Sequence, residues 1–273
     1  MSTRLPGRYL VGLTAGGRVR VMAAVVDGPA DEIRERHALT RNAAILAAEG
    51  LVASLLMSAH IKGEERLTVE VRTERPPLVF TADIDAIGVL RARFTPTRLP
   101  PDRRMNGVMS VMKSLGATPL YRGYASIKNE RFEGALQRYL TESQQTDSRV
   151  RVQAEVDRKG RVRFAAGLLL ERLPDMPVEE FATTYDAVLR GDFQALMTAF
   201  AFGQLAGSRI EVLGAQDFVY RCSCSRGRVL ETLQALGPEE VESMIREQGG
   251  AEVTCHYCNE VYRLGADELR SLA

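Results

Sequence analysis

Cysteine is scarce in this sequence and unevenly placed. The chain of 273 residues has four cysteines, and none of them precedes Cys222. In a reducing compartment, four clustered cysteines form a metal site more often than a disulfide framework. The cysteines are therefore the first candidates for chemistry, and most of the chain must fold without them.

An excess of charge of one sign is also lacking. With 36 basic and 35 acidic residues, the composition gives no general attraction to nucleic acid or to anionic membranes. The first ten residues have neither an uninterrupted apolar run nor a small-residue cleavage site, so we expect no secretory signal. The most apolar stretch, 38–59, contains Arg41, Asn42 and Glu49. It predicts a mostly buried helix rather than a membrane span. We expect a cytoplasmic protein without membrane or nucleic-acid partners.

The length and composition favour a globular protein of more than one domain, with 45% apolar and 26% charged residues. Residues 1–173 alternate short apolar runs with helical patterns, which predicts an α+β fold. The predicted strands are 9–13, 19–26, 67–72, 78–82, 87–94, 107–112, 150–156 and 162–170. The predicted helices are 31–36, 40–60 and 131–143.

A proline-rich break at 173–177 opens the next part of the chain, 174–217, for which we predict two helices. They cover Val178–Leu189 and Asp192–Leu205. The second has an apolar face formed by Phe193, Leu196, Met197, Phe200 and Phe202. A helix this apolar must be covered by the first domain or by a partner, and in a folded resting state ordinary core packing explains it.

The last part, 218–273, holds all four cysteines: Cys222, Cys224, Cys255 and Cys258. Their pattern is Cys-x-Cys, then the long segment 225–254, then Cys-x-x-Cys. Two close pairs suit a tetrahedral ion, and zinc suits four thiolates, with a mononuclear iron site as the chemical competitor. His256 lies inside the second pair, but four cysteines already fill the coordination sphere. Spacing alone favours a purely structural zinc knuckle.

Two other functions compete for this tail. A nucleic-acid-binding zinc ribbon is disfavoured because residues 218–273 contain six arginines and no lysine against nine acidic residues. A thiol-disulfide oxidoreductase would place Cys-x-x-Cys at the start of a helix, whereas Val253–Leu264 predicts a hairpin. His37 and His60 are isolated, so no hydrolytic constellation is expected, and we predict that the chain is not an enzyme.

Several motifs, in the right order along nearly the whole chain, resemble one family. The chain is similar to the 33-kilodalton chaperonin family, the redox-regulated heat-shock holdases of bacteria. In the tail, the resemblance rests on CSCSRGR from Cys222, LGPEE from Leu236, EVTCHYCN from Glu252, and Tyr262. In the body it rests on RHAL at 36–39, LM at 56–57, KGEERLT at 62–68, YRG at 121–123, YLTESQQT at 139–146, and AG at 166–167 before LP at 173–174.

The resemblance implies a chaperone domain at 1–173, a helical linker at 174–217 and a zinc-binding redox switch at 218–273. It implies an ATP-independent holdase that is inactive while reduced, with one zinc ion on the four cysteines. Oxidation would form Cys222–Cys224 and Cys255–Cys258 disulfides, release zinc, unfold the tail and linker, and yield a client-binding homodimer. We expect the apolar residues of the second linker helix to contribute to the client-binding surface.

The sequence departs from the family pattern at two places in the first domain. Residues 73–77 read TERPP where the family usually has a Gly-Pro-rich turn, and residues 90–96 read LRARFTP where it usually has a Gly-Tyr pair followed by Asn-Pro. A lost glycine can move a turn, so these changes concern the first domain's surface, including dimerisation and client contacts. The four zinc ligands are unaffected.

Overall fold

The computed structural model describes residues 7–271, apart from the side chains of residues 187 and 188. The chain forms two compact units that divide between Tyr220 and Arg221. The first unit contains the large sheet and most helices, and the second contains the four cysteines. Each unit is described below by itself.

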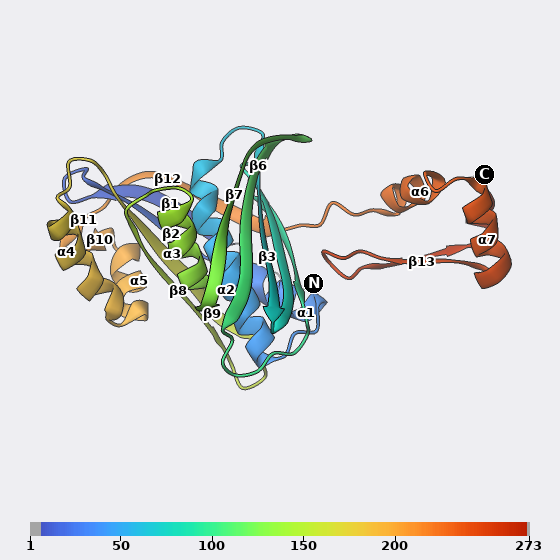
Figure 1. Cartoon of the computed structure of the whole chain (residues 1–273), viewed down its shortest axis with the longest axis horizontal. Coiled ribbons are helices and arrows are strands. Elements are labelled where there is room, and N and C mark those ends of the chain that lie inside the picture. The colour runs from blue at the N-terminus through green and yellow to red at the C-terminus, as the bar shows by residue number, and fades with distance from the viewer. Residues whose placement is uncertain (1–6, 272–273) are drawn as a thin grey trace. The chain divides into compact units, whose positions relative to one another are not determined.

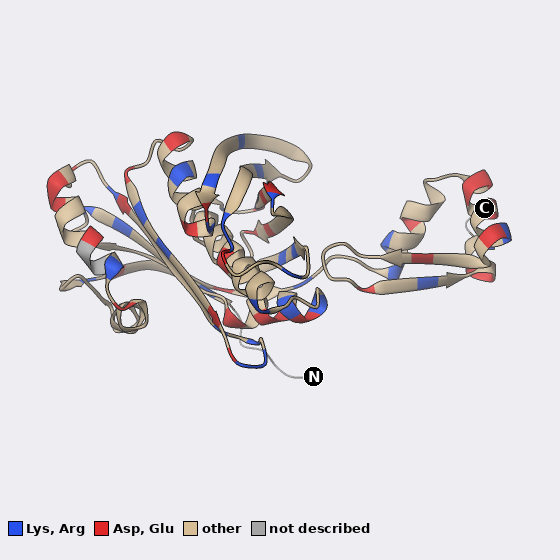
Figure 2. Ribbon diagram, turned by 60° about the horizontal axis from the view of Figure 1, so that its bottom comes forward, with Lys and Arg blue, Asp and Glu red and all other residues tan. Residues whose placement is uncertain are grey.

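The first unit is built on a ten-stranded sheet with the order β7-β6-β3-β4-β5-β12-β1-β2-β9-β8 (Figure 1). All neighbours are antiparallel except β5 and β12, which pair in parallel. Basic and acidic residues are interspersed over the unit (Figure 2). The strands are β1 Gly7–Thr14, β2 Val19–Val25, β3 Glu65–Arg75, β4 Pro77–Asp85, β5 Val89–Thr95, β6 Met105–Leu115, β7 Thr118–Glu130, β8 Ser148–Val156, β9 Val162–Arg172 and β12 Glu211–Tyr220.

Helix α2, Arg41–Met57, forms the centre of the first core. Every residue from Ala43 to Met57 is buried, and strands from both halves of the sheet contribute to the same apolar cluster. Arg41–His60 is long and apolar enough to cross a membrane, but 89% of its apolar window is buried inside the fold. It is the predicted core helix. The other helices on this side are α1 Asp27–Arg36, the 3₁₀ turn Ser58–His60 and α3 Phe132–Glu142.

A second core forms on the opposite face of β2 and β9. There α4, Val178–Arg190, and α5, Phe193–Ala201, pack on the sheet, followed by the short hairpin of β10, Gln204–Leu205, and β11, Ser208–Arg209. Strands β2 and β9 alternate their side chains between the two faces, so each strand contributes to both cores. Residues 174–217 thus belong to the first compact unit, packed on its sheet.

The α+β fold class is confirmed, with two differences in the elements. Strand β7 lies in a segment, 118–130, for which the sequence predicts no element, because its buried positions are small or isolated: Gly123, Ala125 and Ile127. Strand β12 occupies 211–220, so the segment predicted as a helical linker is helical only as far as Ala201. Phe218 is the buried residue of β12, and the half-buried positions that alternate with exposed ones are Gly214, Gln216 and Tyr220. The sequence therefore lacks the apolar alternation that would predict this strand.

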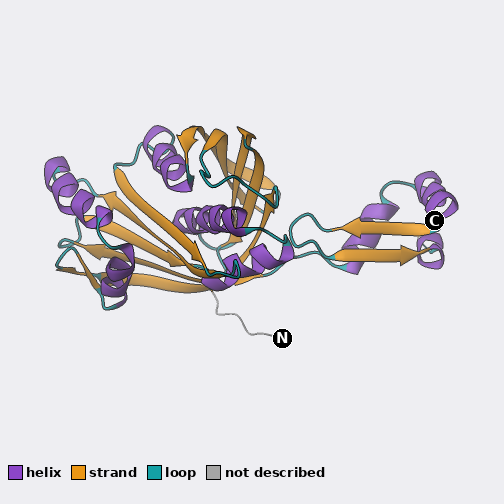
Figure 3. Cartoon of the chain, turned by 90° about the horizontal axis from the view of Figure 1, so that it is seen from below, coloured by secondary structure: helices purple, strands orange, loops and turns teal. Residues whose placement is uncertain are grey.

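The second unit is a small layer of one hairpin and three helices (Figure 3). Strands β13 and β14 pair antiparallel, as predicted for 253–264. Among the residues that the structure describes in this unit, the apolar cluster has five buried members, with six partly buried residues packed against them. The buried five are Val229, Leu233, Val241, Leu264 and Leu269. The elements are α6 Arg226–Gln234, α7 Pro238–Gln248, β13 Gly250–Thr254, β14 Val261–Gly265 and α8 Ala266–Arg270. Pro238 begins α7 and Gly249, at φ 70°, ends it in the left-handed conformation.

Candidate metal centre

The four cysteines of the second unit meet at one point, although the segment 225–254 separates the two pairs in the sequence. Their sulfur atoms all lie within 4.8 Å of one another. The Sγ atoms of Cys222 and Cys255 are 3.6 Å apart, and those of Cys224 and Cys258 are 3.3 Å apart. A tetrahedral site with metal–sulfur bonds of about 2.3 Å requires sulfurs about 3.8 Å apart. The four free thiols therefore fit a single metal ion, as the spacing predicted.

Local backbone structure positions each pair. Cys222 and Cys224 lie in the extended segment before α6, where the Ser225 hydroxyl caps the helix by accepting the Arg228 amide at 3.3 Å. Cys255 and Cys258 lie in the tight turn between β13 and β14. The Cys255 amide donates to the Glu260 carbonyl at 2.9 Å, and the Asn259 amide donates to the Cys255 carbonyl at 2.8 Å. This turn brings its two thiols to the same side.

Two contacts outside the cysteines support the site. The Tyr262 hydroxyl donates to the Cys224 sulfur at 3.1 Å. This hydrogen bond, which holds the proton on the phenol oxygen, raises the pKa of Tyr262. Arg226 Nε donates to Glu268 at 2.7 Å and its Nη2 donates to the Arg263 carbonyl at 2.8 Å, which joins α6 to β14 and α8.

The thiols influence one another's ionisation. Burial raises the pKa of Cys222 and of Cys258. For Cys255 burial acts in the same direction, but the amides of Cys258 and Tyr257 and the neighbouring thiols outweigh it and lower its pKa. Four thiolates this close repel one another, and a bound cation removes that cost. The donor set therefore suits a soft divalent metal.

The five apolar residues proposed for client binding lie in the first unit, on and just after α5. Phe193 and Phe200 are 3% and 6% exposed, and Leu196 and Met197 pack partly buried against the same cluster. Phe202 differs, because it follows the end of the helix and is 81% exposed. Four of the five therefore belong to the packed core of this folded state, as expected for the resting form.

Few polar contacts hold α4 and α5 to the sheet. Arg18 pairs with Glu180 at 2.8 Å, and Arg149 pairs with Asp186 at 2.6 Å. The Arg151 guanidinium donates to the Leu189 carbonyl at 2.9 Å and lies 5.7 Å from the ring centre of Phe193. Exposed pairs of this kind contribute about 1 kcal/mol or less each. The apolar contacts therefore dominate the attachment.

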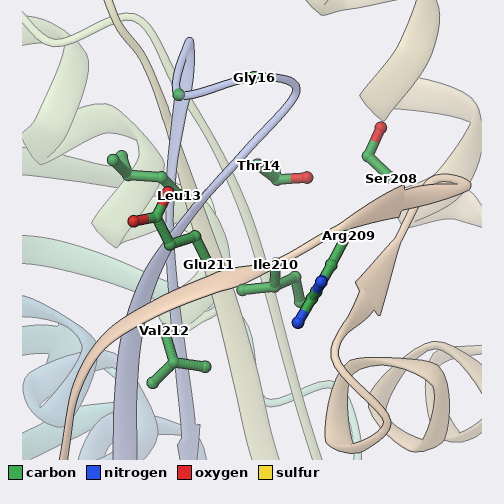
Figure 4. A pocket seen from close by; sticks show the side chains of 9 residues that line it. Leu13, Thr14, Gly16, Ser208, Arg209, Ile210, Glu211 and Val212 are labelled. Atoms are coloured by element: carbon green, nitrogen blue, oxygen red, sulfur yellow. The ribbon is translucent and has the colours of Figure 1, made fainter.

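A crevice lies beside the segment of the chain that follows α5. Residues 208–212 pass the β1–β2 hairpin there, and Leu13, Thr14, Gly16 and Gly17 line the opposite wall (Figure 4). A side chain added at Gly16 or Gly17 would meet nothing within 4 Å. The hairpin tip therefore leaves space on this side of the crevice, whereas Gly12 lies close to Ile210 and Glu211 at the entry into β12.

Comparisons with known proteins agree over nearly the whole chain. The model of the Hsp33 protein family matches residues 8–265. A 33 kDa chaperonin of Geobacillus kaustophilus is 30% identical over 97% of both chains. A 33 kDa chaperonin of Thermus thermophilus is 30% identical over 97% of this chain and 86% of its own. The crystal structure of a 33 kDa chaperonin from Thermotoga maritima superposes with a TM-score of 0.83 at 22% identity, covering 98% of this chain and 97% of that chain.

Proposed function

Because the chain belongs to the Hsp33 family of chaperones, we propose that it is an ATP-independent holdase controlled by the redox state of its four cysteines. In the reduced state it holds one zinc ion and binds clients weakly. Oxidation of the thiolates to disulfides activates it. The single observation that carries the proposal is the gathering of four sulfurs within 4.8 Å in a unit with a five-residue core.

Cys222, Cys224, Cys255 and Cys258 are the proposed zinc ligands. When bound, zinc supplies a divalent charge that stabilises the thiolates and cross-links the two halves of the second unit. Five buried apolar residues provide a thin core for some fifty residues, so the unit's folding depends strongly on that cross-link. Tyr262 keeps the Cys224 sulfur in place by its hydrogen bond.

Oxidation removes the cross-link. Two thiolates give up two electrons to an oxidant such as hypochlorous acid, which leaves as chloride and hydroxide, and the two sulfurs form one disulfide. A disulfide no longer offers anionic ligands. We propose that Cys222 joins Cys224 and that Cys255 joins Cys258. These links close very short loops and constrain the unfolded chain little, so the second unit loses its long-range connection.

The client-binding surface of the active form is proposed to lie on both sides of the α4–α5 contact with the sheet. If these helices detach, they uncover Phe193 and Phe200 together with the sheet face beneath. That face is apolar and at most 5% exposed at each position: Val19, Val21, Ala23, Ala166, Leu168 and Leu170. Strand β12 leads directly from this region to Cys222, which gives the switch a covalent path to the helices.

We also propose the partners, the oligomeric state and the location of this chaperone. The partners are unfolding client proteins, and the oxidised form is a homodimer. The chain acts in the cytoplasm, without nucleic acid, membrane or enzymatic activity.

The decisive experiment measures zinc content and suppression of thermal aggregation of citrate synthase before and after treatment with hypochlorite. We expect one zinc per chain and little suppression in the reduced protein, then zinc loss and strong suppression after oxidation. A reducing agent added with zinc should restore the first state. Equal suppression of aggregation in both states, or suppression that requires bound zinc, would contradict the proposed redox switch.

The same samples test the two competing functions. Reduction of insulin that depends on Cys255 or Cys258 would favour an oxidoreductase. A salt-sensitive mobility shift with DNA or RNA would favour a zinc ribbon.

A further inference from the structure

A cavity in the first unit is separate from both the cysteine cluster and the α4–α5 contact. It lies where α2 and α3 end above the sheet, and its volume is about 290 Å³. An apolar cavity of about 150 Å³ is large enough to bind benzene. This cavity is therefore large enough for a bicyclic aromatic compound.

The floor of the cavity is apolar and rigid. It consists of Met57, Leu67, Val111 and Leu140, each at most 4% exposed. They come from α2, β3, β6 and α3, so four packed elements fix their positions. Such a floor favours a flat hydrocarbon ring over a polar ligand.

One wall carries hydrogen-bonding groups, of which the Tyr139 hydroxyl is buried and the Gln144 and Tyr121 side chains are exposed. Tyr139 is 2% exposed, and its hydroxyl accepts a hydrogen bond from the Gln144 side chain at 2.9 Å. The same amide group donates to the Tyr121 hydroxyl at 2.9 Å. Burial raises the pKa of Tyr139. Phenol and amide groups are neutral at neutral pH, so this wall offers uncharged polar groups to a ligand.

The charged groups around the cavity already neutralise one another. Lys113 pairs with Glu65 at 2.8 Å. Glu171, which is 6% exposed, lies 3.3 Å from His60 and 3.4 Å from Arg20. A charged ligand would have to compete with one of these pairs and lose its own hydration. A neutral ligand has neither cost.

We infer that this cavity is a binding site for a small neutral aromatic compound, with its ring on the apolar floor and one polar group toward Tyr139 and Gln144. Indole and p-cresol have this chemistry and are suitable probes. The site does not depend on the redox proposal, because its walls belong to the first unit.

The test exploits the absence of tryptophan from the sequence. Indole added to the reduced, zinc-loaded full-length protein is the dominant fluorophore, and its burial shifts the emission to shorter wavelength. We expect a saturable shift with one site per chain, and displacement of indole by p-cresol. An emission spectrum that does not change with protein concentration would overturn the proposal.

Two variants and a control locate the site. Ile61→Phe fills the cavity from its wall, and Thr146→Phe does so from a partly exposed loop position that tolerates a larger side chain. We expect each to weaken indole binding about tenfold or more, with folding checked by circular dichroism. Val108→Phe is the control, because Val108 is 47% exposed on the same strand as Val111 and outside the cavity.

Undiminished indole binding in folded Thr146→Phe would contradict the assignment, even if Ile61→Phe does not fold. N-acetyl-tryptophanamide tests whether the site binds a free small compound or the tryptophan side chain of a polypeptide. We expect it to bind at least tenfold more weakly than indole, because its two additional amide groups would lose hydration against the apolar floor. Equal or tighter binding of the amide would overturn the small-molecule assignment.

Discussion

Tyr262 touches the metal centre from outside the ligand set. It is 38 residues from Cys224 in the sequence, yet its hydroxyl lies 3.1 Å from that sulfur. A hydrogen bond to a thiolate stabilises the charged form, and partners of metal ligands contribute strongly to affinity. Tyr262 is therefore the residue whose change should weaken zinc binding without removing a ligand.

For Tyr262→Phe we predict a loss of zinc affinity of about tenfold, and faster oxidation at a given dose of hypochlorite. Competition with a chromophoric chelator at fixed pH measures the affinity. Tyr124→Phe, which removes the hydroxyl of an exposed ring in the first unit, should leave it unchanged. Equal zinc affinity in Tyr262→Phe and in the unmodified chain would show that this hydrogen bond does not contribute to zinc binding.

The four cysteines can form disulfides either within the two close pairs or between them. Sulfur distances of 3.6 and 3.3 Å join Cys222 to Cys255 and Cys224 to Cys258. Disulfides across those pairs would close long loops and stabilise the tail by about 4 kcal/mol. Only the near-neighbour pairs, Cys222–Cys224 and Cys255–Cys258, let the second unit unfold.

We predict the near-neighbour pairing after hypochlorite treatment. Trypsin cuts after Arg226 and Arg246, which puts the two cysteine pairs on different peptides. Mass spectrometry should then find each pair oxidised within one peptide, and a reduced sample should show free thiols. Disulfide-linked peptides from the two ends of the unit would instead mean that oxidation preserves the long-range connection.

More of the metal centre could be predicted from the sequence than of the contacts around it. Spacing alone predicts that the two cysteine pairs share an ion, because a tetrahedron has two opposite edges. The partner of Tyr262 could not be predicted, since it depends on how β14 lies against the segment before α6. The sequence likewise does not indicate that Asn259 takes a left-handed conformation, at φ 56°, to close the turn.

At the scale of elements, α5 decides whether the apolar face of the sheet is covered. The Phe193 ring meets Phe164 of β9 edge-on at 6.1 Å, and Phe200 is buried in the same cluster. Removing a buried phenylalanine costs about 3 kcal/mol or more. That is more than the exposed ion pairs of α4 can replace.

We predict that Phe193→Ala suppresses aggregation while still reduced and still binding one zinc, because α5 then detaches without oxidation. Phe202→Ala is the matched control: its side chain is 81% exposed, so the resting protein should remain inactive. Hydrogen exchange over 193–201 reports the detachment directly. Rapid exchange there without any gain in activity would separate this helix from client binding.

The elements that the sequence failed to predict share a physical cause. Strands β7 and β12 have few large apolar side chains at their inward-facing positions, which are Gly123, Ala125 and Ile127 in β7 and Gly214, Gln216, Phe218 and Tyr220 in β12. Strand β12 pairs with β1 at the opposite end of the first unit's sequence, so β1 rather than local propensity stabilises it. The long helix, the hairpins and the α+β class depend on local patterns and were predictable.

At the scale of the molecule, the two units differ greatly in how they are stabilised. The first buries two extensive apolar clusters around a ten-stranded sheet. The second has five buried apolar residues and the four cysteines. A unit with so thin a core obtains much of its folding free energy from a metal. The first unit needs none.

Removal of the metal should therefore unfold one unit and spare the other. After treatment of the reduced protein with a strong zinc chelator, we predict rapid proteolysis within 221–271 and a resistant fragment ending near Tyr220. Replacement of all four cysteines by serine should give the same pattern, while addition of zinc should restore protection only to the unmodified chain. A second unit that stays protected in the serine variant would mean that its apolar core suffices. Disulfide formation at the cysteines could then not unfold it by removing the metal, and the proposed switch would lose its physical basis.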